Sequence, residues 1–278
     1  MKLVAQNYGK QRVRVMKVLR ASPRHEVKEV EFGVRLEGDF ESSYTAGDNS
    51  QVVPTDTMKN TVHALAHQHL GTQVEPFAAF LAGHFLKHYP QVARVTVEAS
   101  ERRWARLAVA GVPHDHTFSG QEGRPIATVA AARGGVAQIE SGIEDLVILK
   151  STGSSFAGYP KCAYTTLPET HDRILATRLR ATWRWGAAPA DFTAANAALL
   201  DAMLAVFARN PSPSVQATLY EMAGAALAAA PQVTQVSLAM PNRHYLPANL
   251  KPFGLDATGV SFVATDDPHG QIEATIAR

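Results

Sequence analysis

Residues 13–21 read VRVMKVLRA and residues 26–40 read EVKEVEFGVRLEGDF, and these two stretches decide the fold. In the second stretch, four apolar residues alternate with polar ones: Val30, Phe32, Val34 and Leu36. Successive side chains of a β-strand point to opposite faces, so this alternation predicts a strand with one buried face. A short turn around Ser22 and Pro23 separates the stretches, and we therefore expect a long hairpin.

After the polar residues 44–54 the spacing becomes helical, with apolar residues one to two turns apart: Met58, Val62 and Leu65. Thr55 or Thr57 is the expected N-cap of this helix. A second helix is expected over residues 76–89. Strand signals then return in two stretches, residues 91–111 and 114–120. The first half therefore predicts two strands, two helices and two strands.

The second half of the chain repeats this order of elements. Strands are expected over residues 136–152 and 178–186, and later over residues 232–246 and 259–277. Between them lies an alanine-rich helix, whose apolar side is formed by Leu200, Met203, Leu204 and Phe207. A further helix follows, with Ser214 as its N-cap. The repeat predicts an α+β protein made of two tandem ββααββ units, residues 1–135 and 136–278.

Long antiparallel strands covered by helices on one face leave open sheet edges, and such edges are usually paired or covered. Joining edges between chains would close a barrel between subunits. The predicted architecture therefore requires an oligomer.

Composition excludes several classes of function. The 278 residues carry a formal charge of +2, which gives no reason to expect nucleic acid or an acidic membrane as a partner. The one local series of basic residues has the period of a solvated strand face: Arg178, Arg180 and Arg184. Cys162 is the only cysteine, so no disulfide can form within the chain. With no signal peptide at its start and no peroxisomal signal at its end, the chain is expected in the cytoplasm.

No glycine-rich phosphate loop, nicotinamide fingerprint or nucleophile elbow is found at a strand-to-helix turn. Two histidine pairs have the spacing of metal ligands: His63 with His67, and His114 with His116. Neither pair has an identifiable third ligand, so we interpret both as surface or structural histidines and expect no metal.

Five segments are harder to explain as generic structure. They are residues 7–15 (NYGKQRVRV), 52–66 (VVPTDTMKNTVHALA), 154–185 (SSFAGYPKCAYTTLPETHDRILATRLRATWRW), 214–223 (SVQATLYEMA) and 236–250 (VSLAMPNRHYLPANL). In order and spacing they resemble the signature segments of the urate oxidase (uricase) family. Nearly the whole chain takes part in this resemblance.

The resemblance implies a role for each matching residue. Lys10, Thr55 and His244 would form the proton-transfer group. The residues implied to bind urate are Thr55, Asp56, Phe156, Leu167, Arg173, Val215, Gln216 and Asn242, with Asn242 holding oxygen or water above the ring. The chain departs from the family pattern at Ala157, His171 and Asn249, none of which is among these contacts, so the departures bear on fine specificity.

The family further implies the tunnelling fold (T-fold), with sites at the interfaces of a homotetramer. It implies no cofactor, since urate itself can reduce oxygen to give 5-hydroxyisourate and hydrogen peroxide. The residue types suit this chemistry. An arginine fork and a glutamine amide match the polar edges of a flat anion, and a phenyl ring can stack on its face. A neutral Lys10 beside Thr55 would serve as the base.

Two other functions stay open at this stage. A pterin or purine hydrolase or aldolase of the same fold would use the same barrel, but with a metal or an acidic anchor. A non-catalytic purine-binding protein would keep the pocket without the proton relay, and the joint presence of Lys10, Thr55 and His244 argues against it.

Overall fold

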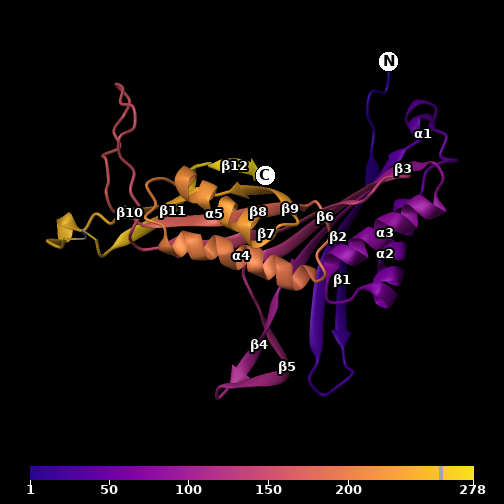
Figure 1. The fold of residues 1–278 in the computed structure, drawn as a ribbon, viewed down its shortest axis with the longest axis horizontal. Helices are drawn as coiled ribbons and strands as arrows, with labels where there is room; N and C mark the ends of the chain where they lie inside the picture. Colours follow the sequence, from indigo (N-terminus) through magenta and orange to yellow (C-terminus); the bar gives the residue numbers. More distant parts are fainter. Residues whose placement is uncertain (257–258) are drawn as a thin grey trace. The chain divides into compact units, whose positions relative to one another are not determined.

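A computed structural model describes residues 1–256 and 259–278 of the chain (Figure 1). The protein is mixed α+β, and the strand pairs with a defined register are all antiparallel. Two compact units can be distinguished, residues 1–142 with 184–194, and residues 143–183 with 195–278. Strands β7 (Gln138–Lys150) and β8 (Leu175–Trp185) contribute residues to both. The predicted division into residues 1–135 and 136–278 stays a prediction.

The first unit is an antiparallel sheet with helices on one face. Its strands lie in the order β1 (Tyr8–Leu19), β2 (Glu26–Gly38), β3 (Val92–Arg102) and β6 (Arg124–Ala132). Helices α2 (Thr55–His69) and α3 (Val74–His88) cover one face (Figure 1). The alternation predicted for β2 is confirmed, because four of its side chains are 0% exposed: Val30, Phe32, Val34 and Leu36.

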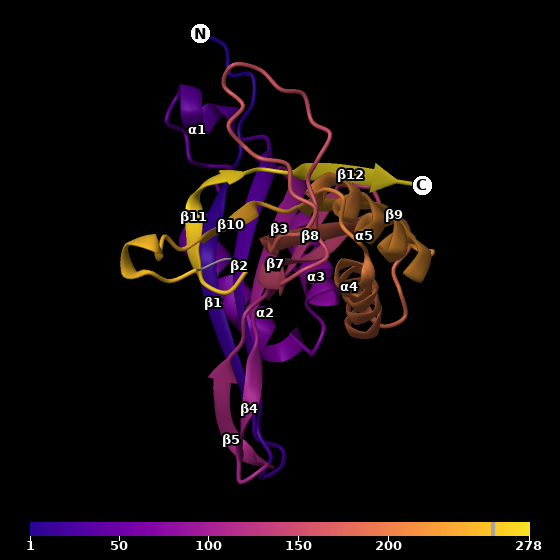
Figure 2. The ribbon, with the colours of Figure 1, turned by 90° about the vertical axis from the view of Figure 1, so that its left-hand side faces the viewer.

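Three smaller elements complete the first unit. Helix α1 (Glu41–Thr45) follows β2, and strands β4 (Trp104–Val109) and β5 (Val112–Gly120) form a separate hairpin. The backbone amide of His25, next to the β1–β2 turn, donates a 3.0 Å hydrogen bond to the carbonyl of Asp115 in β5. The two hairpins therefore lie side by side near their tips (Figure 2).

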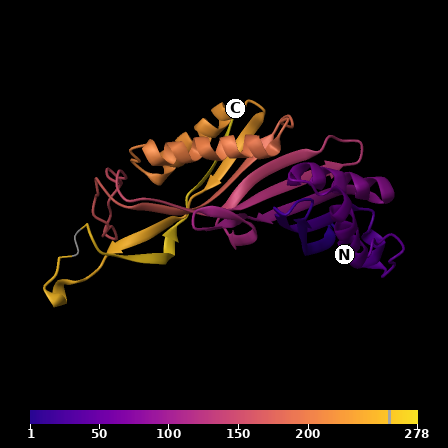
Figure 3. The same ribbon diagram turned by 90° about the horizontal axis from the view of Figure 1, so that it is seen from below.

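In the second unit, β7, β8, β10 (Asn242–Pro247) and β11 (Phe262–Gly270) are neighbours in that order. Strand β9 (Val233–Ala239) pairs with β8 and with β12 (Glu273–Ala277), and a short 3-10 helix, η1 (Lys251–Phe253), precedes β11. Helices α4 (Phe192–Arg209) and α5 (Val215–Ala229) lie together on one side of these strands (Figure 3).

Helix α4 is long and apolar enough to cross a membrane by length and composition alone. Only 22% of it is buried, by apolar side chains on one side of the helix: Phe192, Leu199, Met203 and Phe207. Of the four residues predicted to form its apolar side, Met203 and Phe207 are buried, whereas Leu200 and Leu204 are only half-buried. As predicted for their series, Arg178, Arg180 and Arg184 are exposed.

One arginine in each unit closes a helix in the same way. Arg133, which follows β6, donates from one terminal nitrogen to the carbonyls of Leu86, Tyr89 and Val92 at the end of α3. Arg278, which follows β12, donates from a terminal nitrogen to the carbonyls of Leu227 and Ala230 at the end of α5, and from Nε to that of Val233. The last carbonyls of a helix have no partner within the helix, so these guanidinium groups satisfy them.

The predictions for the helix N-termini had different outcomes. The Ser214 hydroxyl caps α5 as predicted, accepting a 3.1 Å hydrogen bond from the amide of Ala217. The prediction that Thr55 or Thr57 caps α2 was wrong. Pro54 occupies the cap position, no side chain caps this end, and Thr55 is the first helical residue. The Thr55 hydroxyl is therefore not used in capping.

Candidate active site

Lys10 lies beside an irregularity in β1. It pairs with Val34 of β2, whereas Val13, three residues further on, pairs with Phe32, only two residues away. Strand β1 therefore contains one extra residue, which is a β-bulge. Because opposite residues in an antiparallel pair share a face, Lys10 lies on the helix-covered face with Val34. In a regular strand Lys10 would share a face with Arg14, four residues further on, because side chains alternate between faces. The bulge therefore moves Lys10 to the helix-covered face.

Three features of the sequence accommodate the bulge. Arg12 has a φ of 59°, a left-handed conformation that costs a non-glycine residue about 1 kcal/mol or more. A Cβ atom on Gly9 would lie 1.8 Å from the carbonyl oxygen of Val34, so only glycine fits beside Lys10. At Gly33 a Cβ atom would lie 2.1 Å from the side-chain oxygen of Gln11, which occupies that space. Bulges often re-aim a side chain next to an active site.

Tyr8 connects the strand of Lys10 to the segment that leads into α2. Its hydroxyl accepts a 2.7 Å hydrogen bond from the backbone amide of Val53, two residues before Thr55. Its ring packs edge-on against Phe40 at 4.8 Å between centroids. Burial raises the pKa of Tyr8, so the phenol stays protonated. Sequence reasoning missed this role, because a tyrosine at the start of a strand carries no signal for it.

Thr55 and Asp56 are exposed at the first turn of α2. The first backbone N–H groups of a helix have no partner within it and attract anions. The Asp56 carboxylate is itself engaged, with Lys59 at 2.5 Å and Asn60 at 2.9 Å. These hydrogen bonds and charges, led by Lys59 and including Lys10, lower the pKa of Asp56. The first group of site residues thus comprises Lys10, Thr55 and Asp56 of the first unit.

In the second unit, one loop places Phe156 and Arg173 together. Phe156 and Thr170 exchange backbone hydrogen bonds of 2.8 and 3.0 Å, and the amide of Arg173 donates to the carbonyl of Ser154 at 2.8 Å. The guanidinium carbon of Arg173 lies 5.5 Å from the centre of the Phe156 ring. The cation and the aromatic face predicted to bind one planar anion are therefore neighbours.

Neither of the acidic residues near Arg173 in the sequence forms an ion pair with its guanidinium group in the described contacts. Glu169 pairs with Lys161 at 3.1 Å. Asp172 accepts hydrogen bonds from the Thr152 hydroxyl and, at 2.7 Å, from the amide of Gly153. These bonds, from Thr152 first, lower the pKa of Asp172. Asp172 therefore holds the two ends of the loop together.

Arg173 is half-buried and incompletely satisfied. Its Nε is buried and has no hydrogen-bond partner among the described residues, and burial lowers the pKa of its guanidinium. An unpaired buried donor costs about 1–3 kcal/mol, so buried polar groups in folded proteins are normally paired. An anion bound at this position would supply the missing acceptor.

The N-terminus of α5 is tied to the same loop. Ser154 forms a bridge with Ser212, and the amide of Ser155 donates to the Ser212 carbonyl at 2.8 Å. Three residues after Ser212, α5 begins with buried Val215 and exposed Gln216. The segments predicted to hold Arg173 and Gln216 are thus connected by backbone hydrogen bonds.

Leu167 lies in the same loop, between Phe156 and Thr170 in the sequence. It is 56% exposed, and its carbonyl accepts a 2.6 Å hydrogen bond from the hydroxyl of Tyr159. The Tyr159 ring stacks on Phe156 at 4.9 Å. Leu167 therefore does not line a closed pocket within one chain, although its backbone is fixed relative to the stacking ring.

Asn242 and His244 lie at the start of β10. Asn242 pairs with Thr177 of β8, and His244 pairs with Thr265 of β11. Opposite residues of an antiparallel pair share a face, so Asn242 lies on the same side as Thr177. The pairing with β11 shifts between Asn242 and His244. The Thr177 hydroxyl is buried and has no hydrogen-bond partner among the described residues. Sequence reasoning missed Thr177, because nothing in the β8 pattern distinguishes it from a core residue.

The histidine pairs do not form a metal site in the described part of the chain. No group of three or more His, Cys, Asp or Glu residues there could hold a metal ion. His114 and His116 instead contact each other, with ring centres 4.6 Å apart.

Comparison with known proteins decides the family. The uricase family model matches residues 6–129 and 139–273, which include every predicted site residue. The chain belongs to the uricase family. It is 41% identical to the uricase of Arthrobacter globiformis over 98% of this chain and 88% of that protein. It is also 41% identical to the uricase of Cyberlindnera jadinii, over 99% of this chain and 97% of that protein.

Solved structures of the family have the same fold. The crystal structure of the Arthrobacter globiformis uricase matches with a TM-score of 0.93 at 40% identity, covering 100% of this chain and 95% of that one. The urate oxidase of Bacillus sp. TB-90 matches with a TM-score of 0.83 at 23% identity, covering 98% of this chain and all of that one, which is a likeness of fold.

The three positions expected from the sequence to depart from the uricase family pattern share one property. Ala157, His171 and Asn249 are all exposed in the chain. None of them takes part in the hydrogen bonds described above that hold the Phe156 loop. These departures therefore leave that loop intact.

Proposed function

We propose that this chain is a cofactor-independent urate oxidase. It converts urate, O2 and water to 5-hydroxyisourate and hydrogen peroxide, a reaction in which all atoms balance. The observation that carries the proposal is the match to the uricase family along nearly the whole chain, with every predicted site residue inside it. The orphaned polar atoms beside the site residues support an anionic, hydrogen-bonding ligand.

The second-unit group binds the substrate in this proposal. Urate is a flat anion with donors and acceptors alternating around its rim. The Arg173 fork pairs with one O/N edge, and the amide of Gln216 supplies a donor and an acceptor to the opposite edge. Phe156 stacks on one ring face, which contributes about 1–3 kcal/mol by analogy with base stacking. The other ring face stays open to oxygen.

The first-unit group removes a proton. The second deprotonation of urate gives a dianion that can transfer an electron to O2. Lys10 acts as the base, and the Thr55 hydroxyl relays the proton. The free backbone amides at the start of α2 favour the negative charge that develops.

Asn242 and His244 serve the oxygen side of the reaction. The Asn242 amide offers a neutral hydrogen bond to O2 or to the attacking water. His244, two residues further along β10, passes protons to the peroxide. The unpaired Thr177 hydroxyl opposite Asn242 supports a polar ligand at this position.

We further propose that the complete site forms between subunits of a homotetramer built from tandem T-fold units. Lys10, Thr55 and Asp56 of one protomer would meet Arg173 and Gln216 of its partner. The matching guanidinium caps of Arg133 and Arg278 support two copies of one ββααββ unit. Strands β1 and β11, at the two ends of the sheet order, support barrel closure by a second chain.

The test is to add urate to purified protein after exhaustive chelation, and to follow oxygen uptake together with the ultraviolet absorbance of urate. We expect urate and oxygen to be consumed in equal amounts, with hydrogen peroxide produced. Loss of urate without oxygen uptake would instead indicate a hydrolase of the same fold. If urate were not consumed at all, the protein would be a purine-binding protein without catalytic activity.

A further inference from the structure

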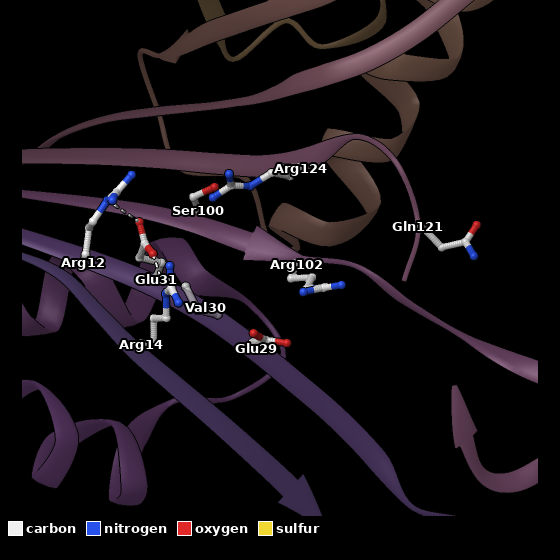
Figure 4. A pocket seen from close by; sticks show the side chains of 9 residues that line it. All are labelled: Arg12, Arg14, Glu29, Val30, Glu31, Ser100, Arg102, Gln121 and Arg124. Carbon is white, nitrogen blue, oxygen red and sulfur yellow. Dashed lines mark hydrogen bonds and ion pairs between the residues drawn. The ribbon is translucent and has the colours of Figure 1, made fainter. Parts of the chain in front are cut away.

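The sheet face opposite α2 and α3 in the first unit carries a hollow of about 410 Å³. Six charged side chains line it, four arginines and two glutamates: Arg12, Arg14, Arg102, Arg124, Glu29 and Glu31. The lining therefore has a formal excess of two positive charges. Figure 4 shows these side chains projecting from neighbouring strands around one space. None of them belongs to the predicted urate site.

The two carboxylates in the hollow already have partners. Glu31 accepts a 2.9 Å hydrogen bond from Nε of Arg14 and lies 3.9 Å from Nε of Arg12 (Figure 4). Glu29 accepts a 2.9 Å hydrogen bond from the indole of Trp104. The side chains of Arg12 and Arg14 are still 80% and 72% exposed, so their outer nitrogens are open to a ligand.

Arg12 belongs to the β-bulge and lines this hollow. It lies on the same face of the sheet as Arg14, whereas the bulge turns Lys10 toward the helices, and Arg12 itself has a left-handed φ of 59°. Such backbone strain in a non-glycine residue is typical of functional positions. The bulge therefore separates Lys10 on one face of the sheet from Arg12 and Arg14 on the other.

We propose that this hollow binds a small, multiply charged oxyanion of the phosphate class. Guanidinium groups pair bidentately with phosphate oxygens, and several of them around one space suit a ligand with more than one negative charge. A flat aromatic ligand is disfavoured, since Arg102 already covers the Trp104 ring at 4.7 Å. This proposal is independent of urate oxidation.

The test measures binding of pyrophosphate to the full-length protein by titration calorimetry at constant ionic strength, with inorganic phosphate and citrate in parallel. We expect one pyrophosphate per chain, bound more tightly than either of the others. The double variant Arg12→Gln/Arg14→Gln should weaken binding by about tenfold or more. The control Arg20→Gln/Arg24→Gln removes the same charge from exposed positions outside the hollow and should bind as the unaltered protein does.

Glu31→Gln gives a change in the opposite direction, because it removes the carboxylate that competes for Arg14 and Arg12. It should tighten pyrophosphate binding several-fold, and so tests the hollow even if the double variant fails to fold. Equal affinity in the unaltered protein and in both the double variant and Glu31→Gln would overturn the proposal. So would the absence of pyrophosphate binding, as expected if a second copy of the chain covers this face, or tighter binding of citrate.

Discussion

The hydroxyl of Tyr8 accepts a 2.7 Å hydrogen bond from the backbone amide of Val53. This bond joins β1, two residues before Lys10, to the segment that enters α2 two residues before Thr55. The position of Lys10, the proposed base, relative to the Thr55 hydroxyl therefore depends on Tyr8, although this hydrogen bond involves neither residue.

Tyr8→Phe removes that acceptor and keeps the ring packed on Phe40. We expect kcat to fall by about tenfold, which corresponds to about 1.4 kcal/mol, with little change in the KM for urate. Steady-state kinetics will measure both constants. The control is Tyr44→Phe, since the Tyr44 hydroxyl makes only an exposed 3.4 Å contact with the Asn7 carbonyl. Equal losses in the two variants would show that Tyr8 has no positioning role.

The bulge in β1 makes a second prediction. Arg12→Val puts a β-branched residue at the left-handed φ of 59°, which should eliminate the bulge and restore simple alternation, so Lys10 should move to the face that carries Arg14. Turnover should then fall to the level of Lys10→Met, while the protein still melts cooperatively. Arg12→Gly tolerates this φ and should retain most of the activity. An active Arg12→Val variant would mean that the bulge does not determine where Lys10 lies.

Substitutions in the two groups of site residues should separate catalysis from binding. Lys10→Met should reduce kcat far more than it affects urate binding, because the lysine acts on the proton. Arg173→Ala should chiefly raise KM, because it removes the bidentate anchor. Urate binding measured without oxygen provides the independent check. If both variants retained the kinetics of the unaltered enzyme, the residue assignment would be wrong.

Asp172 predicts a pH dependence of stability. Its pKa is lower in the folded chain than the ordinary value, because Thr152 and Gly153 donate hydrogen bonds to the charged form. The stabilisation is therefore fully present above the ordinary aspartate value, about pH 4, and is lost as the pH falls through the folded-state value. Asp172→Asn should lower the melting temperature near neutral pH and raise KM by loosening the Arg173 loop.

Melting curves of Asp172→Asn and the unaltered protein between about pH 3 and 8 will show this, since the difference should be constant above about pH 5 and shrink below about pH 4. Asp201→Asn, on the exposed side of α4, is the matched control. A difference that persists unchanged at the acidic end would rule out the carboxylate as the source.

Much of the fold could be predicted from local pattern. The alternation around Phe32 and the Ser214 cap follow from side-chain geometry, and both are confirmed. The prediction that Thr55 or Thr57 caps α2 was wrong, because Pro54 takes the cap position and residue propensity alone does not fix a helix boundary. The bulge at Lys10 was not foreseen, since an extra residue in a strand depends on pairing with β2 and leaves no mark in β1 alone.

The site residues were predicted by resemblance to a family, and physical pattern alone would not have found them. Lys10 and Phe156 are ordinary residue types for a strand and a loop. Three supporting residues were missed for the same reason. Tyr8 and Asp172 act through hydrogen bonds to segments distant in sequence. Thr177 stands out only because its buried hydroxyl has no hydrogen-bond partner among the described residues. Such relationships become visible only when the chain is folded.

The claim that the site is shared between subunits can be tested by mixing two impaired chains. Lys10→Met and Arg173→Ala would be co-expressed in equal amounts, purified as mixed oligomers and assayed at a urate concentration well below the KM of Arg173→Ala, where each variant alone has little activity. If Lys10 of one protomer acts with Arg173 of its partner, each mixed pair contains one intact site, and random pairing should restore roughly a quarter of the full activity. Activity no higher than the mean of the two separate variants would contradict the shared site.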